Sequence, residues 1–154
     1  HSWDLSGLPS DSFDAVYTHS FEHFGNPSDM LRQCFRVLKP SGTIMIEVPN
    51  QFYSLKDKVR KTAMELLGEH RYRVFSKPPP LHFHLYYYSH RTISQMLESQ
   101  HFSIRELKTY IPWHPVYHRN QNGKWLQEGL YALGGLVGRG PSLEIVASVE
   151  KKIV

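Results

Sequence analysis

The chain has 154 residues, of which 40% are hydrophobic and 21% are charged, so a packed domain is expected and disorder is not. Its single cysteine, Cys34, excludes an internal disulfide framework, and no apolar run approaches the roughly 20 residues that span a bilayer. The net charge of +4 is modest, and no nucleic-acid-binding signature accompanies it. We therefore expect a cytoplasmic protein with no membrane span and no nucleic-acid partner.

The chain begins with signals for a strand followed by a helix. Residues 13–20 form a short apolar and aromatic run, typical of a strand covered on both faces. A helix is then expected to start at Asn26, which can cap it, with Pro27 at the first helical position. Asp29 adds negative charge at the positive end of this helix. Its buried stripe is predicted at helical spacing by Met30, Leu31, Cys34, Phe35 and Leu38.

A second strand follows this helix. Residues 39–42, Lys-Pro-Ser-Gly, are expected to end the helix and turn the chain, and residues 43–48 form a nearly continuous apolar run. Strand, capped helix, turn and strand predict a βαβ unit within residues 1–50, with its two strands parallel. The pattern indicates an open α/β sheet.

The middle of the chain predicts two further helices. The first is amphipathic, with a basic outer face and with apolar positions Leu55, Val59, Ala63, Leu66 and Leu67. Its basic residues form either a solvated face or a patch that attracts an anionic acceptor. Residues 68–88 are irregular, and Ser89 is expected to cap a helix with Ile93, Met96 and Leu97 facing inward.

The C-terminal third predicts two strands around a less regular region. A strand is expected at about residues 102–111, a loop at 112–124, a short helix at about 125–133 and a glycine-rich turn at 134–140. Along residues 143–150, apolar side chains alternate with polar ones for most of the length, which favours an antiparallel strand.

Several segments, taken in order, resemble the class I S-adenosylmethionine-dependent methyltransferases of the type 11, 12 and 23 groups. Residues 4–16 are similar to the family segment D-x-x-x-LP-x-x-x-x-FD-x-V, and Phe21-Glu22-His23 is similar to LEH after strand four. Residues 36–42 resemble RVLKPGG, with Ser41 in place of the first glycine. Residues 84–89 resemble HLYFFS, and His101 stands where the family usually has glycine.

The resemblance implies a Rossmann-like sheet in which this chain supplies strands four to seven, with the last strand antiparallel. Residues 1–154 would then be the C-terminal part of one methyltransferase domain, with variable substrate-side insertions at residues 51–88 and 112–141. The family's glycine-rich cofactor loop and its acidic ribose-binding residue have no counterpart in this sequence. We therefore expect the chain to be a piece of a longer enzyme, inactive by itself.

The resemblance also implies the cofactor contacts. Asp4 would accept a hydrogen bond from the adenine amino group of S-adenosylmethionine, and the Leu5 amide would meet the ring; the alternative for Asp4 is a turn or capping residue. Ligands of open α/β sheets bind beyond the carboxyl ends of the strands. We therefore expect His19, Ser20 and Phe21 to lie on the cofactor side.

A hydroxyl acceptor would need a general base, and histidine suits that role near neutral pH. His19 and His23 are the candidates by position. The alternatives are that His23 orients the helix start, and that His19 contacts the methionine portion of the cofactor. Asn50, His84 and Tyr86 are predicted on the acceptor side, where the segment around His84 would roof the pocket.

A metal centre is not expected from the sequence. His82-x-His84 could form a metal pair, but no third ligand stands at a recognisable zinc spacing.

The resemblance as a whole implies methyl transfer to a small-molecule or glycan-like acceptor by the full-length parent. The alternative is a non-catalytic dimerisation or regulatory module, and in either case a homodimer could form across the exposed edge of the first strand.

Overall fold

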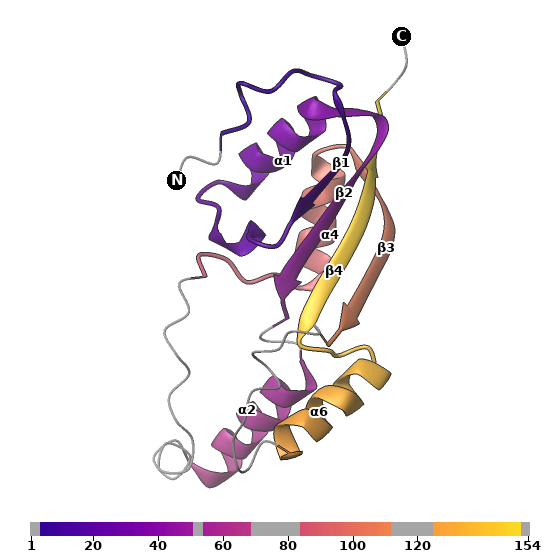
Figure 1. Ribbon diagram of the computed structural model, residues 1–154. Coiled ribbons are helices and arrows are strands. Elements are labelled where there is room, and N and C mark those ends of the chain that lie inside the picture. Colours follow the sequence, from indigo (N-terminus) through magenta and orange to yellow (C-terminus); the bar gives the residue numbers. More distant parts are fainter. Residues whose placement is uncertain (1–3, 51–53, 69–83, 112–124, 152–154) are drawn as a thin grey trace.

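The computed structural model describes residues 4–50, 54–68, 84–111 and 125–151 (Figure 1). Within them, one four-stranded sheet has the order β1-β2-β4-β3. Its strands are β1 (Phe13–Thr18), β2 (Leu38–Pro49), β3 (Phe102–Tyr110) and β4 (Ser142–Val149). β1 and β2 are parallel, and β4 runs antiparallel to both of its neighbours, β2 and β3. The predicted α/β sheet with an antiparallel last strand is confirmed.

Helix α1 (Pro27–Val37) connects the two parallel strands. The Asn26 side chain accepts a hydrogen bond of 3.1 Å from the Asp29 amide, and Pro27 is the first helical residue, as the sequence predicts. The inward stripe of the helix includes the buried side chains of Met30, Leu31 and Cys34. A capped start and one apolar face therefore position α1 against the sheet.

The predicted turn at residues 39–42 lies inside β2, which starts earlier than expected. Leu38 pairs with Phe13, and Thr43 pairs with Ala15, so several residues of β2 lie opposite a single residue of β1. Ser41 adopts a positive φ of 63° at this irregularity. A turn-like conformation is therefore present at Ser41, as predicted, but β2 continues on both sides of it.

Helix α4 (His90–Ser99) starts with a reciprocal capping box between Ser89 and Thr92. Ile93 and Leu97 are fully buried, as predicted. Beyond the helix end, His101 has a φ of 63°, the left-handed conformation that glycine adopts most easily. This is the position at which the resembled family usually carries glycine, so the turn has kept a glycine-like backbone without the glycine.

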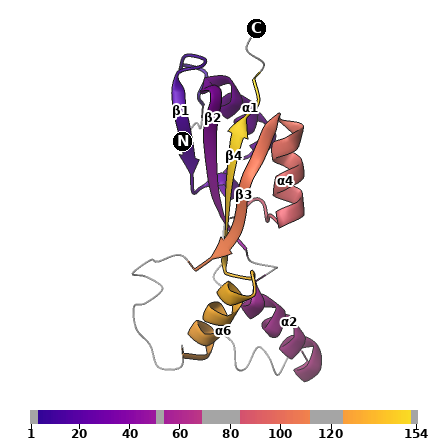
Figure 2. The ribbon, with the colours of Figure 1, turned by 90° about the vertical axis from the view of Figure 1, so that its right-hand side faces the viewer.

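The core lies between α1, α4 and one face of the sheet, and both helices lie on that face (Figures 1 and 2). Alternate residues of β2 and β4 supply its floor, namely Ile44, Ile46, Val48, Leu143, Ile145 and Ala147. Burying each large apolar side chain contributes about 1.5–3 kcal/mol. The opposite face of β2 carries Thr43, Met45 and Glu47, which are only partly buried.

Helices α2 (Leu55–Leu67) and α6 (Trp125–Leu136) lie together beyond the carboxyl end of β2 (Figures 1 and 2). Both helices were expected, but α6 extends through Gly134 and Gly135, where a turn was predicted. The apolar stripe of α2 is largely uncovered, since none of its residues is buried and Leu66 is 80% exposed. Among the described residues, no helix has the length and apolar character needed to cross a membrane.

Candidate functional site

The carboxyl end of β1 places His19 beside a carboxylate of the neighbouring strand. Thr18, the last residue of β1, pairs with Ile46. The residues that follow these two, His19 and Glu47, therefore also lie side by side. The His19 Nε2 atom lies 3.2 Å from Glu47 Oε1. The His19 side chain is 61% exposed, whereas that of Glu47 is 13% exposed. The pair therefore joins a half-buried acid to an accessible imidazole.

Glu47 also binds a tyrosine. The Tyr17 hydroxyl donates a hydrogen bond of 2.9 Å to Glu47 Oε2, so Tyr17 and His19 meet different oxygens of the same carboxylate. An imidazole that donates its Nε2–H group to a carboxylate presents Nδ1 as an acceptor. This arrangement can accept a proton from a ligand at the carboxyl end of β1. Sequence reasoning missed Glu47, because only the strand register brings it to His19.

The short 3-10 helix η1 (Phe21–His23) follows β1 directly. Phe21 is fully buried, with its ring centroid 5.6 Å from that of Phe24 and 5.5 Å from that of Tyr88. Ser20 is half-buried, and its carbonyl accepts a hydrogen bond of 3.0 Å from the His23 amide. Phe21 therefore anchors η1 in the core, and Ser20 and His23 lie nearer the surface.

The segment before α4 packs against η1. The amides of Leu85 and Tyr86 donate hydrogen bonds of 3.0 Å and 3.2 Å to the Glu22 carbonyl. The Tyr86 hydroxyl donates a further bond of 3.0 Å to the carbonyl of Gly25. His84 and Tyr86, both predicted on the acceptor side, are thus held on η1 and close to His23.

Glu22 lies at the centre of this contact, with its side chain only 6% exposed. Its Oε1 atom lies 3.6 Å from His23 Nε2 and 3.7 Å from His84 Nε2. The two imidazole rings meet edge to face at a centroid distance of 4.9 Å. Burial raises the pKa of the Glu22 carboxyl, and its own backbone hydrogen bond and the charges of His23 and His19 oppose that shift. His82, the other member of the H-x-H motif, lies outside the described residues.

Asp4 and Leu5, the predicted adenine contacts, lie against α1. The exposed Asp4 carboxylate accepts hydrogen bonds of 2.8 Å from the backbone amide and from the hydroxyl of Ser6. The hydrogen bond from the Ser6 amide is the main cause of the lowered pKa of Asp4. The Leu5 amide donates to Gln33 Oε1 at 2.8 Å. Asp4 thus forms the turn that was its alternative role, and the Leu5 amide already has an acceptor.

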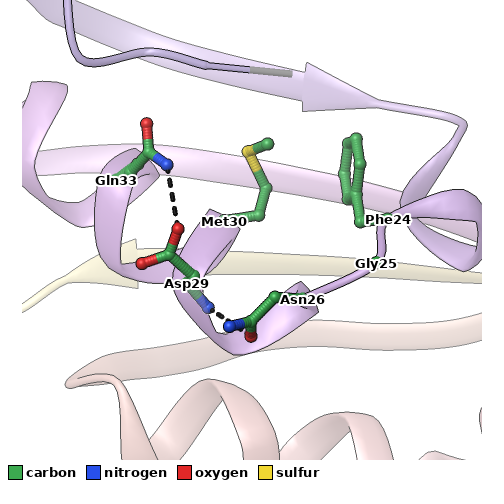
Figure 3. A pocket seen from close by; sticks show the side chains of 6 residues that line it. All are labelled: Phe24, Gly25, Asn26, Asp29, Met30 and Gln33. Carbon is green, nitrogen blue, oxygen red and sulfur yellow. Dashed lines mark hydrogen bonds between the residues drawn. The ribbon is translucent and has the colours of Figure 1, made fainter. Parts of the chain in front are cut away.

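A hollow of about 220 Å³ lies beside this contact (Figure 3). Gln33 links the two regions, since its Nε2 donates to Asp29 Oδ2 at 3.1 Å on the hollow side. The lining residues are Phe24, Gly25, Asn26, Asp29, Met30 and Gln33. None of the sequence-predicted site residues lines this hollow, although Tyr86 bonds to one of its walls at Gly25.

Asn50 lies just beyond the carboxyl end of β2 and is 1% exposed. Its Nδ2 donates a hydrogen bond of 2.8 Å to the carbonyl of Gly140, and its backbone amide donates one of 2.8 Å to Pro141. Asn50 therefore ties β2 to the segment that leads into β4, and its predicted contact with the acceptor stays a prediction.

Comparison with known proteins identifies the fold. A family model described as a methyltransferase domain matches residues 4–107. The chain belongs to the methyltransferase-domain family. No curated protein gives a significant sequence match.

Solved methyltransferase structures have the same fold as this chain. The chain is similar to one from the complex of the Trm112 methyltransferase activator with a methyltransferase in Haloferax volcanii, with 16% identity and a TM-score of 0.59 over 94% of this chain and 57% of that one. A SAM-dependent methyltransferase of Archaeoglobus fulgidus gives 18% identity and a TM-score of 0.54 over 94% and 62%. A SAM-dependent methyltransferase of Mesorhizobium loti gives 17% identity and a TM-score of 0.54 over 94% of this chain and 66% of that one. The predicted Rossmann-like methyltransferase fold is confirmed, and the chain spans less than two thirds of each relative.

The five predicted cofactor contacts differ in how well they suit S-adenosylmethionine. Asp4 and His19 are exposed, and Ser20 is half-buried, so all three are accessible to a polar ligand, and His19 and Ser20 directly follow β1. The Leu5 amide would have to exchange Gln33 for the ring, and Phe21 has no exposed surface. The exposure of Asp4, His19 and Ser20 is therefore compatible with their predicted cofactor contacts, which stay predictions.

Proposed function

We propose that this methyltransferase domain takes part in S-adenosylmethionine-dependent methyl transfer to a small-molecule or glycan-like acceptor. The observation that carries the proposal is the His19–Glu47 pair at the carboxyl end of β1, the end at which open α/β sheets bind ligands. The bound cofactor supplies an activated methyl group. Asp4 and Ser20 would hold it, and α2 and α6, beyond β2, would border the acceptor.

His19 is the general base in this proposal, and Glu47 is a positioning residue. Glu47 holds the imidazole at 3.2 Å, and Tyr17 holds Glu47 at 2.9 Å. His19 would take the proton of an acceptor hydroxyl as that oxygen bonds to the methyl carbon, and the bond from that carbon to the sulfonium sulfur would break, with S-adenosylhomocysteine as the leaving group. His23, the second candidate base, lies instead beside the buried Glu22. The geometry therefore favours His19.

The test, made on the full-length parent, is transfer of an isotope-labelled methyl group from S-adenosylmethionine to hydroxyl-bearing metabolites and saccharides. Wild type, His19→Ala and His90→Ala are compared; His90 is exposed at the start of α4 and serves as the matched control. Transfer that is lost in His19→Ala and kept in His90→Ala supports the proposal. Transfer that is equal in all three removes His19 from the chemistry.

A second candidate is a dimerisation or regulatory module built on the same fold. Within the described residues β1 pairs only with β2, and Tyr17 and Phe13 on this edge strand are 60% and 37% exposed. An exposed, aromatic edge can pair with another copy of itself. Dimerisation across β1 together with an absence of methyl transfer would favour this function over catalysis.

A further inference from the structure

We propose that Glu22, His23 and His84 form a binding site for a divalent transition-metal ion of the zinc class. The three side chains each offer one donor atom, and these atoms lie within 4.8 Å of one another. Two imidazole nitrogens and one carboxylate oxygen make a His₂Glu donor set, which protein zinc sites use while keeping a fourth position open. Spacing along the chain did not predict this set of three ligands, because His84 joins the other two only through the fold.

The distances between donor atoms match those of a metal site. Ligand atoms at about 2.0–2.1 Å from a tetrahedral zinc ion are about 3.4 Å apart. Glu22 Oε1 lies 3.6 Å from His23 Nε2 and 3.7 Å from His84 Nε2. A shift of a few tenths of an ångström would therefore bring either imidazole nitrogen to the spacing that it needs from Glu22 Oε1, and the two nitrogens lie within 4.8 Å of one another.

The buried carboxylate supplies an independent indication of a ligand. Glu22 is 5% exposed, and its Oε2 atom is buried without a hydrogen-bond partner. A buried carboxylate with an unsatisfied oxygen is costly, and a cation bound at Oε1 would offset the charge of the whole carboxylate. His23 is 41% exposed and leaves the site open to solvent on one side, so an ion can enter.

The scaffold holds the three ligands before any ion binds. The amides of Leu85 and Tyr86 both donate to the Glu22 carbonyl, so the residue after His84 is tied to the middle of η1. Phe21 fixes the other side of η1 through its contacts with Tyr88 at 5.5 Å. Such preorganisation lowers the ordering cost of ligand capture.

The donor set selects the class of ion. Imidazole nitrogen suits Zn²⁺, Co²⁺, Ni²⁺ and Cu²⁺, whereas Mg²⁺ and Ca²⁺ take oxygen ligands. A metal on His23 would occupy the nitrogen that a base needs, which leaves His19 for the proton transfer proposed above. The metal proposal does not depend on that function and can be tested without it.

The test is calorimetric titration of Zn²⁺ into the chelator-treated protein. We expect one zinc ion per chain at this site and a loss of affinity of at least about tenfold in both Glu22→Gln and His84→Ala. His90→Ala, the exposed control, should bind as wild type. Binding of Co²⁺ should give visible absorption bands that Glu22→Gln lacks, which reports the inner ligand set directly.

Glu22→Gln is the deciding variant because it keeps the shape of the side chain. Circular dichroism confirms that it folds, and a lost or weakened zinc site in the folded variant supports the proposal. Unchanged zinc affinity in Glu22→Gln and His84→Ala overturns it, as does no zinc binding by wild type. A preference for Mg²⁺ over Zn²⁺ would also overturn it.

Discussion

The Nε2 atom of His19 lies 3.2 Å from Oε1 of Glu47, and the parallel pairing of β1 with β2 creates this contact. Because the register fixes Thr18 opposite Ile46, a slip of one residue would turn Glu47 to the other face of the sheet. The carboxylate is mostly buried and already bound to Tyr17. The pair is therefore part of the sheet's architecture and not an incidental surface contact.

In the full-length parent, replacing His19 by alanine should lower the turnover number for a hydroxyl acceptor by about 100-fold or more, the usual loss for a positioned base. The Michaelis constant for S-adenosylmethionine should change little. Steady-state kinetics with the cofactor varied at a saturating acceptor concentration measure both effects, and weaker cofactor binding with unchanged turnover would show that His19 only contacts the cofactor.

Glu47→Gln should lower turnover less than His19→Ala, by about tenfold, because the amide keeps the shape but not the charge that orients the imidazole. The double variant should be no slower than His19→Ala alone, since Glu47 acts through His19. A double-mutant cycle on the turnover number tests this, and additive losses would contradict it.

Ser41→Gly should raise the free energy of unfolding by about 0.5–1 kcal/mol, because Ser41 holds a left-handed φ of 63° and is exposed. His101→Gly should gain less, since its ring lies 6.0 Å from that of Phe35 and that contact is lost. Urea denaturation provides the measurement. Ser94→Gly, inside α4, is the control and should destabilise, so stabilisation there would contradict the argument.

Cys34 should resist alkylation by iodoacetamide at pH 8 in the native protein. Burial raises the pKa of its thiol from 9.0 to about 11, and the residue is 3% exposed. A thiol with that pKa is only about 0.1% thiolate at pH 8, against about 10% in the unfolded chain. Mass spectrometry should find no adduct until denaturant is added, and rapid modification of the native protein would show that α1 opens readily.

Association of two chains across β1 should be disrupted by Ala15→Lys. Ala15 is exposed on the edge strand, and a lysine there blocks edge-to-edge pairing. Sedimentation velocity should show a concentration-dependent dimer for wild type and a monomer for this variant. Gln95→Lys, exposed on α4, adds the same charge elsewhere and should leave the dimer intact. Wild type that stays monomeric at high concentration would end the dimer hypothesis.

Local signals in the sequence predicted most of the fold. The Asn26 and Ser89 caps and the alternation along β4 are short-range patterns, and the structure contains each of them. The extent of β2 was underestimated, because no local pattern shows that a strand resumes after a turn. The exposure of Leu66 in α2 was also not predictable, since an apolar stripe does not show what covers it.

The candidate site was predicted only in part. Position after the first strand pointed to His19 and His23, and the family resemblance pointed to the segment of His84, but neither indicated which of these residues meet. Glu47 reaches His19 through strand pairing, and Glu22 reaches His84 through backbone bonds to the next two residues. Such contacts depend on three-dimensional arrangement, and spacing along one chain carries no information about them.

The central position of β4 has a consequence for synthesis. In the order β1-β2-β4-β3, β4 lies between two strands that are made before it, with Thr43 pairing to Ser148 and Phe102 to Val149. Such long-range pairing slows folding, because a long loop must close before the contacts form. Until residues 142–149 leave the ribosome, the apolar side chains of β2 and β3 lack their partner. A nascent chain halted before Ser142 should therefore depend on chaperones and aggregate without them.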